Sequence, residues 1–167
     1  MNNRSNSSRW FVAVTMMFLA LRASADTANE APQLDQLFPK STMQIATPDA
    51  RLHNFNIWLA DNDWRRARGL MFVKQMPADH GMLFIYPQPI RASMWMKNTF
   101  IPLDMLFVAA DGKVMQVIAN TKPQSLKTIE STDEVVAVIE LNAGTAERLH
   151  IAKGARVMHA LFQSRSK

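Results

Sequence analysis

Residues 103–119, LDMLFVAADGKVMQVIA, consist of two apolar runs joined by the dipeptide Asp111-Gly112. This dipeptide tolerates the positive backbone angles of a type I′ turn, the connection that suits two adjacent antiparallel strands. The segment is therefore predicted to be a β-hairpin, which commits this part of the chain to an antiparallel sheet.

Other short segments have strand or helix patterns. Strands are predicted where apolar residues alternate or run together, at residues 51–60, 81–87, 91–97, 134–141 and 155–162. The segment 134–141 is apolar on both faces, as in a sheet covered on both sides. A first short helix is predicted with Asp61 or Asn62 as its N-cap and Gly69 at its C-terminal end. A second is predicted from Thr145 to about Arg148.

Strands outnumber helices, their connections are short, and no βαβ crossover of adequate length is visible. The predicted fold is therefore mainly β (α+β), a compact antiparallel sandwich or barrel-like domain with two short helices. A chain of 167 residues is expected to form one domain once any processed segment is removed. We place this domain at residues 44–163.

The first 25 residues have the pattern of a signal peptide. A polar start with Arg4 and Arg9 precedes an apolar run of about a dozen residues, too short to span a membrane, and then the small residues 23–25. We predict export to the periplasm or the medium, with cleavage after Ala25. Arg22, beside the cleavage site, leaves open whether cleavage is clean. Residues 26–43 have no sustained period and are predicted to be a flexible arm.

Composition excludes several classes of function. The formal charge of +5 includes three arginines of the signal peptide, so residues 26–167 carry 16 basic and 14 acidic side chains, or +2. That balance does not favour nucleic-acid binding. The chain has no cysteine, which excludes disulfides, thiolate metal sites and cysteine nucleophiles. We expect no cofactor, no stable membrane insertion after signal cleavage, and a monomer.

Several motifs follow one another in an order typical of one family. They are RARGLMF at 66–72, GMLF at 81–84, MWMKNTFIPLDMLF at 94–107, DGKV at 111–114 and VIELNAGTA at 138–146. Over roughly residues 52–160 the chain resembles the prokaryotic domain-of-unknown-function family 192. The resemblance implies a compact, mainly β domain, often behind a signal peptide. It implies no reaction and no catalytic residues, because none is assigned to the family.

The polar cluster Lys97, Asn98, Thr99 and Asp104 interrupts an apolar stretch. If segments 91–97 and 103–109 pair as a hairpin, residues 98–102 form its loop, and Lys97 and Asp104 meet within one register step. The cluster then has a structural explanation, in which these side chains satisfy the backbone groups of a turn.

A ligand site is the alternative explanation of the same residues. A carboxylate that faces a core must be paired or must change its pKa, and both Asp104 and Glu140 share strand faces with apolar residues. If they converge with Lys97 and Arg66, the group could bind a polar ligand such as a sugar or peptide fragment, with Trp95 as a stacking surface. Facing carboxylates at about 5 to 9.5 Å would instead suit glycoside hydrolysis.

Methionine provides a third possibility, because thioethers are ligands for Cu(I). The candidates are Met94 and Met96, although their shared strand face also suits core packing. No G-x-S-x-G or H-E-x-x-H motif is present, and we predict no catalytic residue. The sequence thus favours a binding or accessory module of the cell envelope, whose ligand or protein partner is unknown. A copper-binding protein and a glycoside hydrolase using Asp104 and Glu140 are the alternatives.

Overall fold

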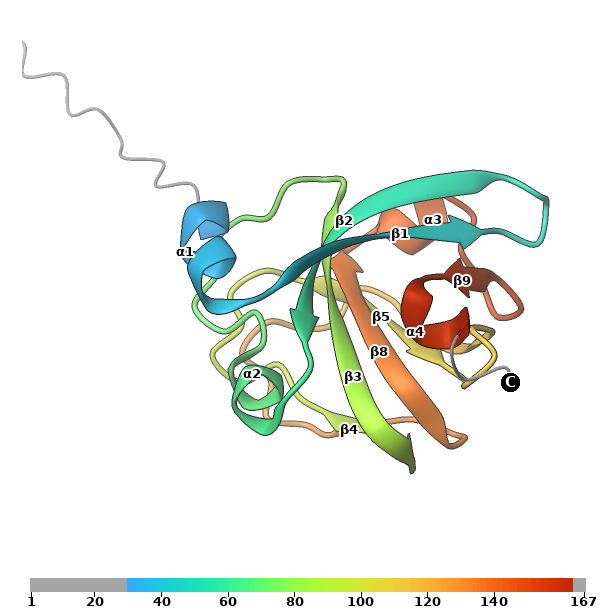
Figure 1. The fold of residues 1–167 in the computed structure, drawn as a ribbon. Helices are drawn as coiled ribbons and strands as arrows, with labels where there is room; N and C mark the ends of the chain where they lie inside the picture. The colour runs from blue at the N-terminus through green and yellow to red at the C-terminus, as the bar shows by residue number, and fades with distance from the viewer. Residues whose placement is uncertain (1–29, 164–167) are drawn as a thin grey trace, which may run out of the picture.

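A seven-stranded sheet organises the protein in its computed structural model, which describes residues 30–163 (Figure 1). The strands run in the order β6-β5-β8-β3-β2-β1-β9, and a second sheet consists of β4 and β7. Their bounds are β1 Lys40–Ala46, β2 Leu52–Ala60, β3 His80–Ile90, β4 Ser93–Met94, β5 Leu103–Val108, β6 Val114–Ile118, β7 Ile129–Glu130, β8 Val135–Asn142 and β9 Arg156–Met158. The mainly β (α+β) class is confirmed.

The large sheet is curled, and its two edge strands meet at one end. A bridge joins Lys113 to Arg156, and the backbone N–H of Val157 donates to the carbonyl of Gly112 at 2.8 Å. A Cβ added to Gly112 would lie 2.5 Å from the Val157 carbonyl oxygen, so only glycine allows the turn to approach β9 this closely. The barrel-like prediction therefore describes the sheet well.

Each face of the sheet carries its own apolar core, because side chains alternate along a strand. One core lies inside the curl and includes Ile57, Leu83, Leu106 and Ile139. The other lies outside and includes Trp58, Met82, Met105 and Val138. The central strand β8 is buried from Val135 to Leu141, which confirms the prediction of a strand covered on both sides.

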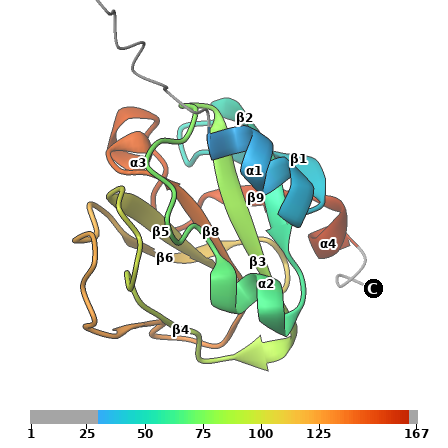
Figure 2. The same cartoon turned by 90° about the vertical axis from the view of Figure 1, so that its left-hand side faces the viewer.

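Four short helices cover these cores: α1 Glu30–Leu37, α2 Asp63–Arg68, α3 Thr145–Arg148 and α4 Ala160–Gln163. Figure 2 shows α1 and α2 on one side of the sheet, with α3 and α4 set apart from them. The predicted ends of α2 are confirmed, since Asn62 caps it by accepting from the Arg65 N–H and Gly69 follows it with a φ of 43°.

The N-terminal part differs from the predicted flexible arm. Within residues 26–43 the structure contains α1 and the first residues of β1, and Leu34 and Phe38 are buried in the outer core. Leu34, Leu37 and Phe38 supply apolar area whose burial fixes the segment. The predicted signal peptide, residues 1–25, lies outside the described residues.

The hairpin β5–β6 is confirmed, but its turn is not type I′. Gly112 has a φ of 83°, whereas Asp111 has no positive φ, so only one residue adopts the left-handed conformation. The second predicted hairpin is wrong: β4 pairs with β7, and β5 pairs with β6 and β8. Lys97 and Asp104 are therefore not neighbours across a ladder.

Two further predictions are corrected. The strands β2 and β3 are parallel, and residues 61–79, which include α2, form the crossover between them. This crossover was not predicted from the sequence. The last strand stops at Met158, because α4 begins at Ala160. Among residues 30–163, none of the helices has the length and apolar character that a membrane span requires.

Candidate functional site

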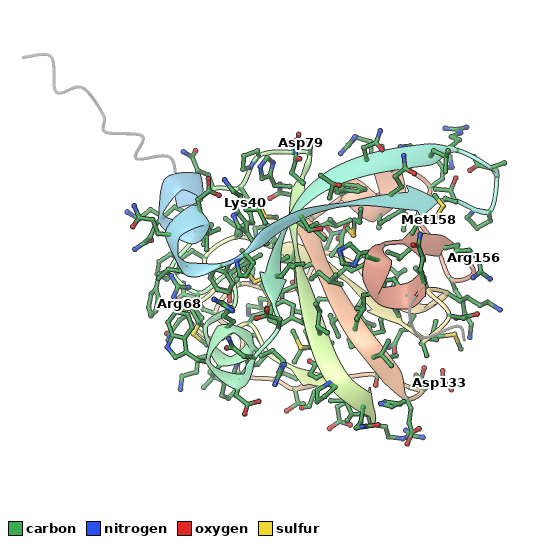
Figure 3. All side chains as sticks on the ribbon, viewed as in Figure 1. Lys40, Arg68, Asp79, Asp133, Arg156 and Met158 are labelled. Carbon is green, nitrogen blue, oxygen red and sulfur yellow. The ribbon has the colours of Figure 1, made fainter. Side chains whose placement is uncertain are left out.

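A cavity of about 310 Å³ lies between α2, β3, β8 and the segment that contains β4. It is lined by five of the seven predicted ligand-binding residues, which are Arg66, Trp95, Lys97, Thr99 and Glu140. We call it the Glu140 cavity. Figure 3 shows the labelled Arg68, another lining residue, beside α2 and at the opposite end of the molecule from Arg156 and Met158 of β9.

Glu140 is the unusual residue of this cavity. It lies on β8 opposite Met82 of β3 and Met105 of β5, and both methionines are fully buried. The residue is 4% exposed, and among residues 30–163 no hydrogen bond or ion pair involves its carboxyl group. Burial raises the pKa of Glu140 to about 8, so the carboxyl is mostly protonated at neutral pH. It is a neutral group that can donate or accept a hydrogen bond.

Tyr86 and Arg66 lie in the same cavity wall. The pKa of Tyr86 is raised to about 12, mainly by burial. The nearby Glu140 also raises this pKa, whereas Arg66 lowers it. Arg66 donates to the Ile85 carbonyl at 2.7 Å, pairs with Asp63, and lies with Cζ 5.7 Å from the Tyr86 ring centroid. Its charge is therefore already engaged by the protein.

The rim is formed by residues 95–99. Trp95 is 51% exposed, and the Nζ of Lys97 lies 5.2 Å from the centroid of its ring. Thr99 is buried and donates to the Lys97 carbonyl at 3.3 Å. Among residues 30–163 Lys97 has no ion-pair partner.

Asn98 supports the rim without lining the cavity. It has a φ of 55°, and its carbonyl accepts from the N–H of Phe72, which itself has a φ of 68°. Asparagine tolerates this conformation better than most residues. The bond, at 2.8 Å, joins the rim to the segment after α2, so Asn98 contributes to the site by shaping it.

Asp104 does not lie at the cavity. Its carboxylate accepts from the backbone N–H of Asn120 at 2.9 Å and of Ala146 at 2.8 Å, on the face that carries the inner core. Because Asp104 is opposite Leu141 and Glu140 is opposite Met105, alternation places the two carboxyl groups on opposite faces of the sheet. The predicted convergence of Asp104 with Glu140, and hydrolysis by that pair, are therefore wrong.

The two methionine candidates are also separated by burial. Met96 is fully buried, and its sulfur accepts from the Thr121 hydroxyl at 3.2 Å. Met94 lines the Glu140 cavity together with Met71, and its sulfur accepts from the Tyr86 hydroxyl at 3.4 Å. Met94 and Met96 thus do not form a common thioether site. Residues 30–163 contain no group of three or more histidine or acidic side chains placed to hold a metal.

Sequence reasoning missed Tyr86 and Met71 as lining residues. Tyr86 follows Met82 and Phe84 at a spacing of two, which places all three on one strand face. This spacing identifies Tyr86 as a cavity residue only when the pairing of β3 with β8 is known. The sequence of neither segment predicts that pairing.

Other polar hollows offer less. A larger one, of about 660 Å³, is lined by Asp35, Lys40, Trp58 and His80, but Asp35 accepts from both Trp58 and Lys40, and His80 pairs with Asp79. These polar groups already form hydrogen bonds and ion pairs with protein side chains, so they favour a bound ligand less than a group without a partner does.

A serine–histidine contact lies elsewhere, where the Nε2 of His159 is 3.1 Å from the Ser41 hydroxyl. Burial lowers the pKa of His159, which favours the neutral ring, and its Nδ1 accepts from the Leu161 N–H. In a neutral ring the proton is then on Nε2, which donates to Ser41. His159 therefore cannot act as the base that activates Ser41.

We expect the substitution Asp104→Asn to lower the free energy of unfolding by about 2 kcal/mol, because it places an amide donor against a buried backbone N–H. Chemical denaturation measures the change. An equally stable variant would show that these two hydrogen bonds contribute little.

Glu140 should make stability fall as pH rises. The folded protein keeps the proton of Glu140 up to about pH 8, whereas the unfolded chain releases it near pH 4.5. The folded state thus binds more protons in this window, and the free energy of unfolding falls by about 1.4 kcal/mol per pH unit. The penalty is absent below the window and constant above it.

Unfolding curves of the parent and of Glu140→Gln, recorded from pH 4 to 9, isolate this contribution from that of other groups. The difference between the two should grow with pH in favour of the variant and then level off. A difference that is independent of pH would contradict the protonated state of Glu140.

Comparison with known proteins places the chain in a family. The profile of DUF192, described as "Uncharacterized ACR, COG1430", matches residues 44–159. No curated protein matches the chain.

Two crystal structures are similar. A Sinorhizobium meliloti 1021 protein, provisionally described as a transcription regulator, is 41% identical, with a TM-score of 0.71 and coverage of 72% of this chain and 94% of that one. A protein of unknown function from Novosphingobium aromaticivorans DSM 12444 is 34% identical, with a TM-score of 0.69 and coverage of 72% and 85%. The profile match and these two similarities agree with the predicted resemblance, and the chain belongs to the DUF192 family.

Proposed function

We propose that the chain is an exported binding module of the cell envelope that holds a small polar ligand in the Glu140 cavity. The observation that carries the proposal is the carboxyl group of Glu140, a residue that is 4% exposed and lines a cavity; this group has no partner among residues 30–163. A buried polar group without a partner costs free energy, which a ligand repays when it supplies the missing hydrogen bond.

The walls of the cavity suit a ligand with both polar and apolar parts. Leu70, Phe84, Met71 and Met94 provide apolar surface, and Ser93 and Thr99 provide hydroxyl groups. Trp95 offers an exposed ring at the rim, on which a sugar face or a planar peptide group packs. Such convergence of a few polar groups in an apolar pocket is the usual character of a small-molecule site.

Three other functions have weaker support. Hydrolysis by Asp104 and Glu140 fails because the two groups lie on opposite faces of the sheet. For copper, the sulfurs of Met71 and Met94 already contact Asn98 and Tyr86, and no cluster of histidine or acidic residues accompanies them within residues 30–163. For DNA binding, the net charge of +2 over residues 26–167 provides little attraction to phosphate.

The envelope location rests on the first 25 residues, whose charged start, apolar run and small residues have the signal-peptide pattern. We expect the full chain fused to alkaline phosphatase to be active outside the cytoplasm, and a fusion that begins at Asp26 to be inactive. Equal activity of the two fusions would contradict export.

We expect NMR titration of the chain from Asp26 with a panel of mono- and disaccharides and of di- and tripeptides to identify a ligand. Its shift changes should cluster at residues that line the Glu140 cavity. The substitution Glu140→Leu should weaken binding at least tenfold, because an apolar side chain of similar size can form no hydrogen bond with the ligand. Trp95→Ala should also weaken it.

The matched control for Trp95→Ala is Trp64→Ala. Trp64 is 57% exposed but stacks on Phe38 and does not line the cavity. A panel that produces no shift at the cavity, or the same loss of binding in both tryptophan variants, would contradict the proposal.

A further inference from the structure

One acidic and one basic side chain, neither with an ion-pair partner among residues 30–163, line the Glu140 cavity. Glu140 is at the buried end, and Lys97 is at the exposed rim over the Trp95 ring. They form no salt bridge with each other, nor with any other side chain of residues 30–163. The protein therefore presents one acidic and one basic group, both free to interact with a ligand.

The other charged groups around the cavity are engaged by the protein. On α2, Asp63 pairs with Arg66, and the guanidinium of Arg68 donates to the carbonyls of Gly69 and Met71. Arg68 also lies with Cζ 5.3 Å from the Phe72 ring centroid. Of the β3 residues that line the cavity, Tyr86 is the titratable one, and its hydroxyl donates to Met94. Glu140 and Lys97 remain as the pair that can select a ligand by charge.

The size of the cavity limits the ligand. A volume of about 310 Å³ lies at the lower end of the range of small-molecule sites, roughly 300 to 1,000 Å³. This size favours a single amino acid or a short peptide over a longer chain.

We propose that the ligand is a zwitterion, an amino acid or a short peptide, whose ammonium group pairs with Glu140 and whose carboxylate pairs with Lys97. This inference rests on the proposed function, since it names the ligand class of the same cavity. The ammonium group supplies donors to the carboxyl oxygens, and a side chain of the ligand packs against Phe84 and the two methionines.

The pH dependence of binding distinguishes this ligand from the alternatives. An ammonium group pairs with the ionised form of Glu140, so binding releases a proton wherever the free carboxyl is protonated. The association constant then rises about tenfold per pH unit below pH 8. For a peptide it falls again at higher pH, because the ligand's own α-amino group, with a pKa of about 8, loses its proton there. A ligand with only an anionic group would show the opposite trend, because it favours the protonated carboxyl. A neutral sugar would show little dependence.

The test is calorimetric titration of the chain from Asp26, at pH 6, 7 and 8, with six probes. Dialanine has both charged groups, N-acetyl-dialanine lacks the ammonium group, dialanine amide lacks the carboxylate, and N-acetylglucosamine is the neutral comparison. Alanine and trialanine separate free amino acids from peptides. We expect dialanine to bind, each cap to weaken binding at least tenfold, and the affinity of dialanine to rise with pH.

Two variants show which residue of the protein binds which charged group of the ligand. In Glu140→Gln, N-acetylation should cause no further loss, and in Lys97→Met, amidation should cause none, because the interaction that each cap removes is already absent. The control is Lys153→Met, which makes the same charge change in the turn before β9, where Gly154 contacts Val114. It should bind as the parent does.

Equal binding of dialanine and N-acetyl-dialanine, or binding of N-acetylglucosamine alone, would contradict the proposal of a zwitterionic ligand. Neither result would contradict the proposal that the cavity is a binding site. A lack of binding by all six probes would also overturn the zwitterion. A different result contradicts the function proposed for the cavity: the NMR titration with the panel of saccharides and peptides produces no shift change at the residues that line it. Thermal unfolding of each variant at pH 6 confirms that a loss of binding is not a loss of fold.

Discussion

The ladders that β8 forms with β3 on one side and β5 on the other place this strand in the interior of the sheet, with apolar side chains covering both of its faces. The inner core, the outer core and the curl of the sheet all depend on this strand. Such a position is shielded from bulk water, so an acidic residue there must find a partner, stay protonated, or serve a ligand. Glu140 occupies that position, and the chemistry of the cavity follows from it.

Two acidic residues show two ways of meeting this constraint. Asp104, one strand away and on the other face, accepts two backbone N–H groups and connects β5 to the start of α3 and to the residues after β6. Its hydrogen bonds are complete within the fold, and they give it a structural role. Glu140 forms no such bonds within residues 30–163 and opens onto a cavity instead. The two carboxyl groups lie on adjacent strands. The hydrogen-bonded one identifies Asp104 as a structural residue, and the one without a partner in residues 30–163 identifies Glu140 as the candidate functional residue.

The sequence predicted local features well, because these depend on neighbouring residues. Asn62 and Gly69 mark the ends of α2, Gly112 marks the β5–β6 turn, and the apolar run at 134–141 marks a strand buried on both faces. Pairing between distant segments could not be read in this way. Nothing in residues 91–97 indicates that β4 pairs with β7, and nothing in residues 30–43 shows that Leu34 and Phe38 find a core to fill. The face of a carboxyl group depends on register, which is why Asp104 and Glu140 were grouped together.

The central claim is that Glu140 is a protonated, ligand-seeking carboxyl group, and its own titration tests this most directly. Carbon-13 NMR of the Glu140 side chain, with assignment by Glu140→Gln, gives its pKa in the free protein and in the presence of dialanine. The account predicts a pKa of about 8 in the free protein and a clearly lower value with dialanine bound. A pKa near 4.5 in the free protein, or one that dialanine leaves unchanged at saturation, would contradict it.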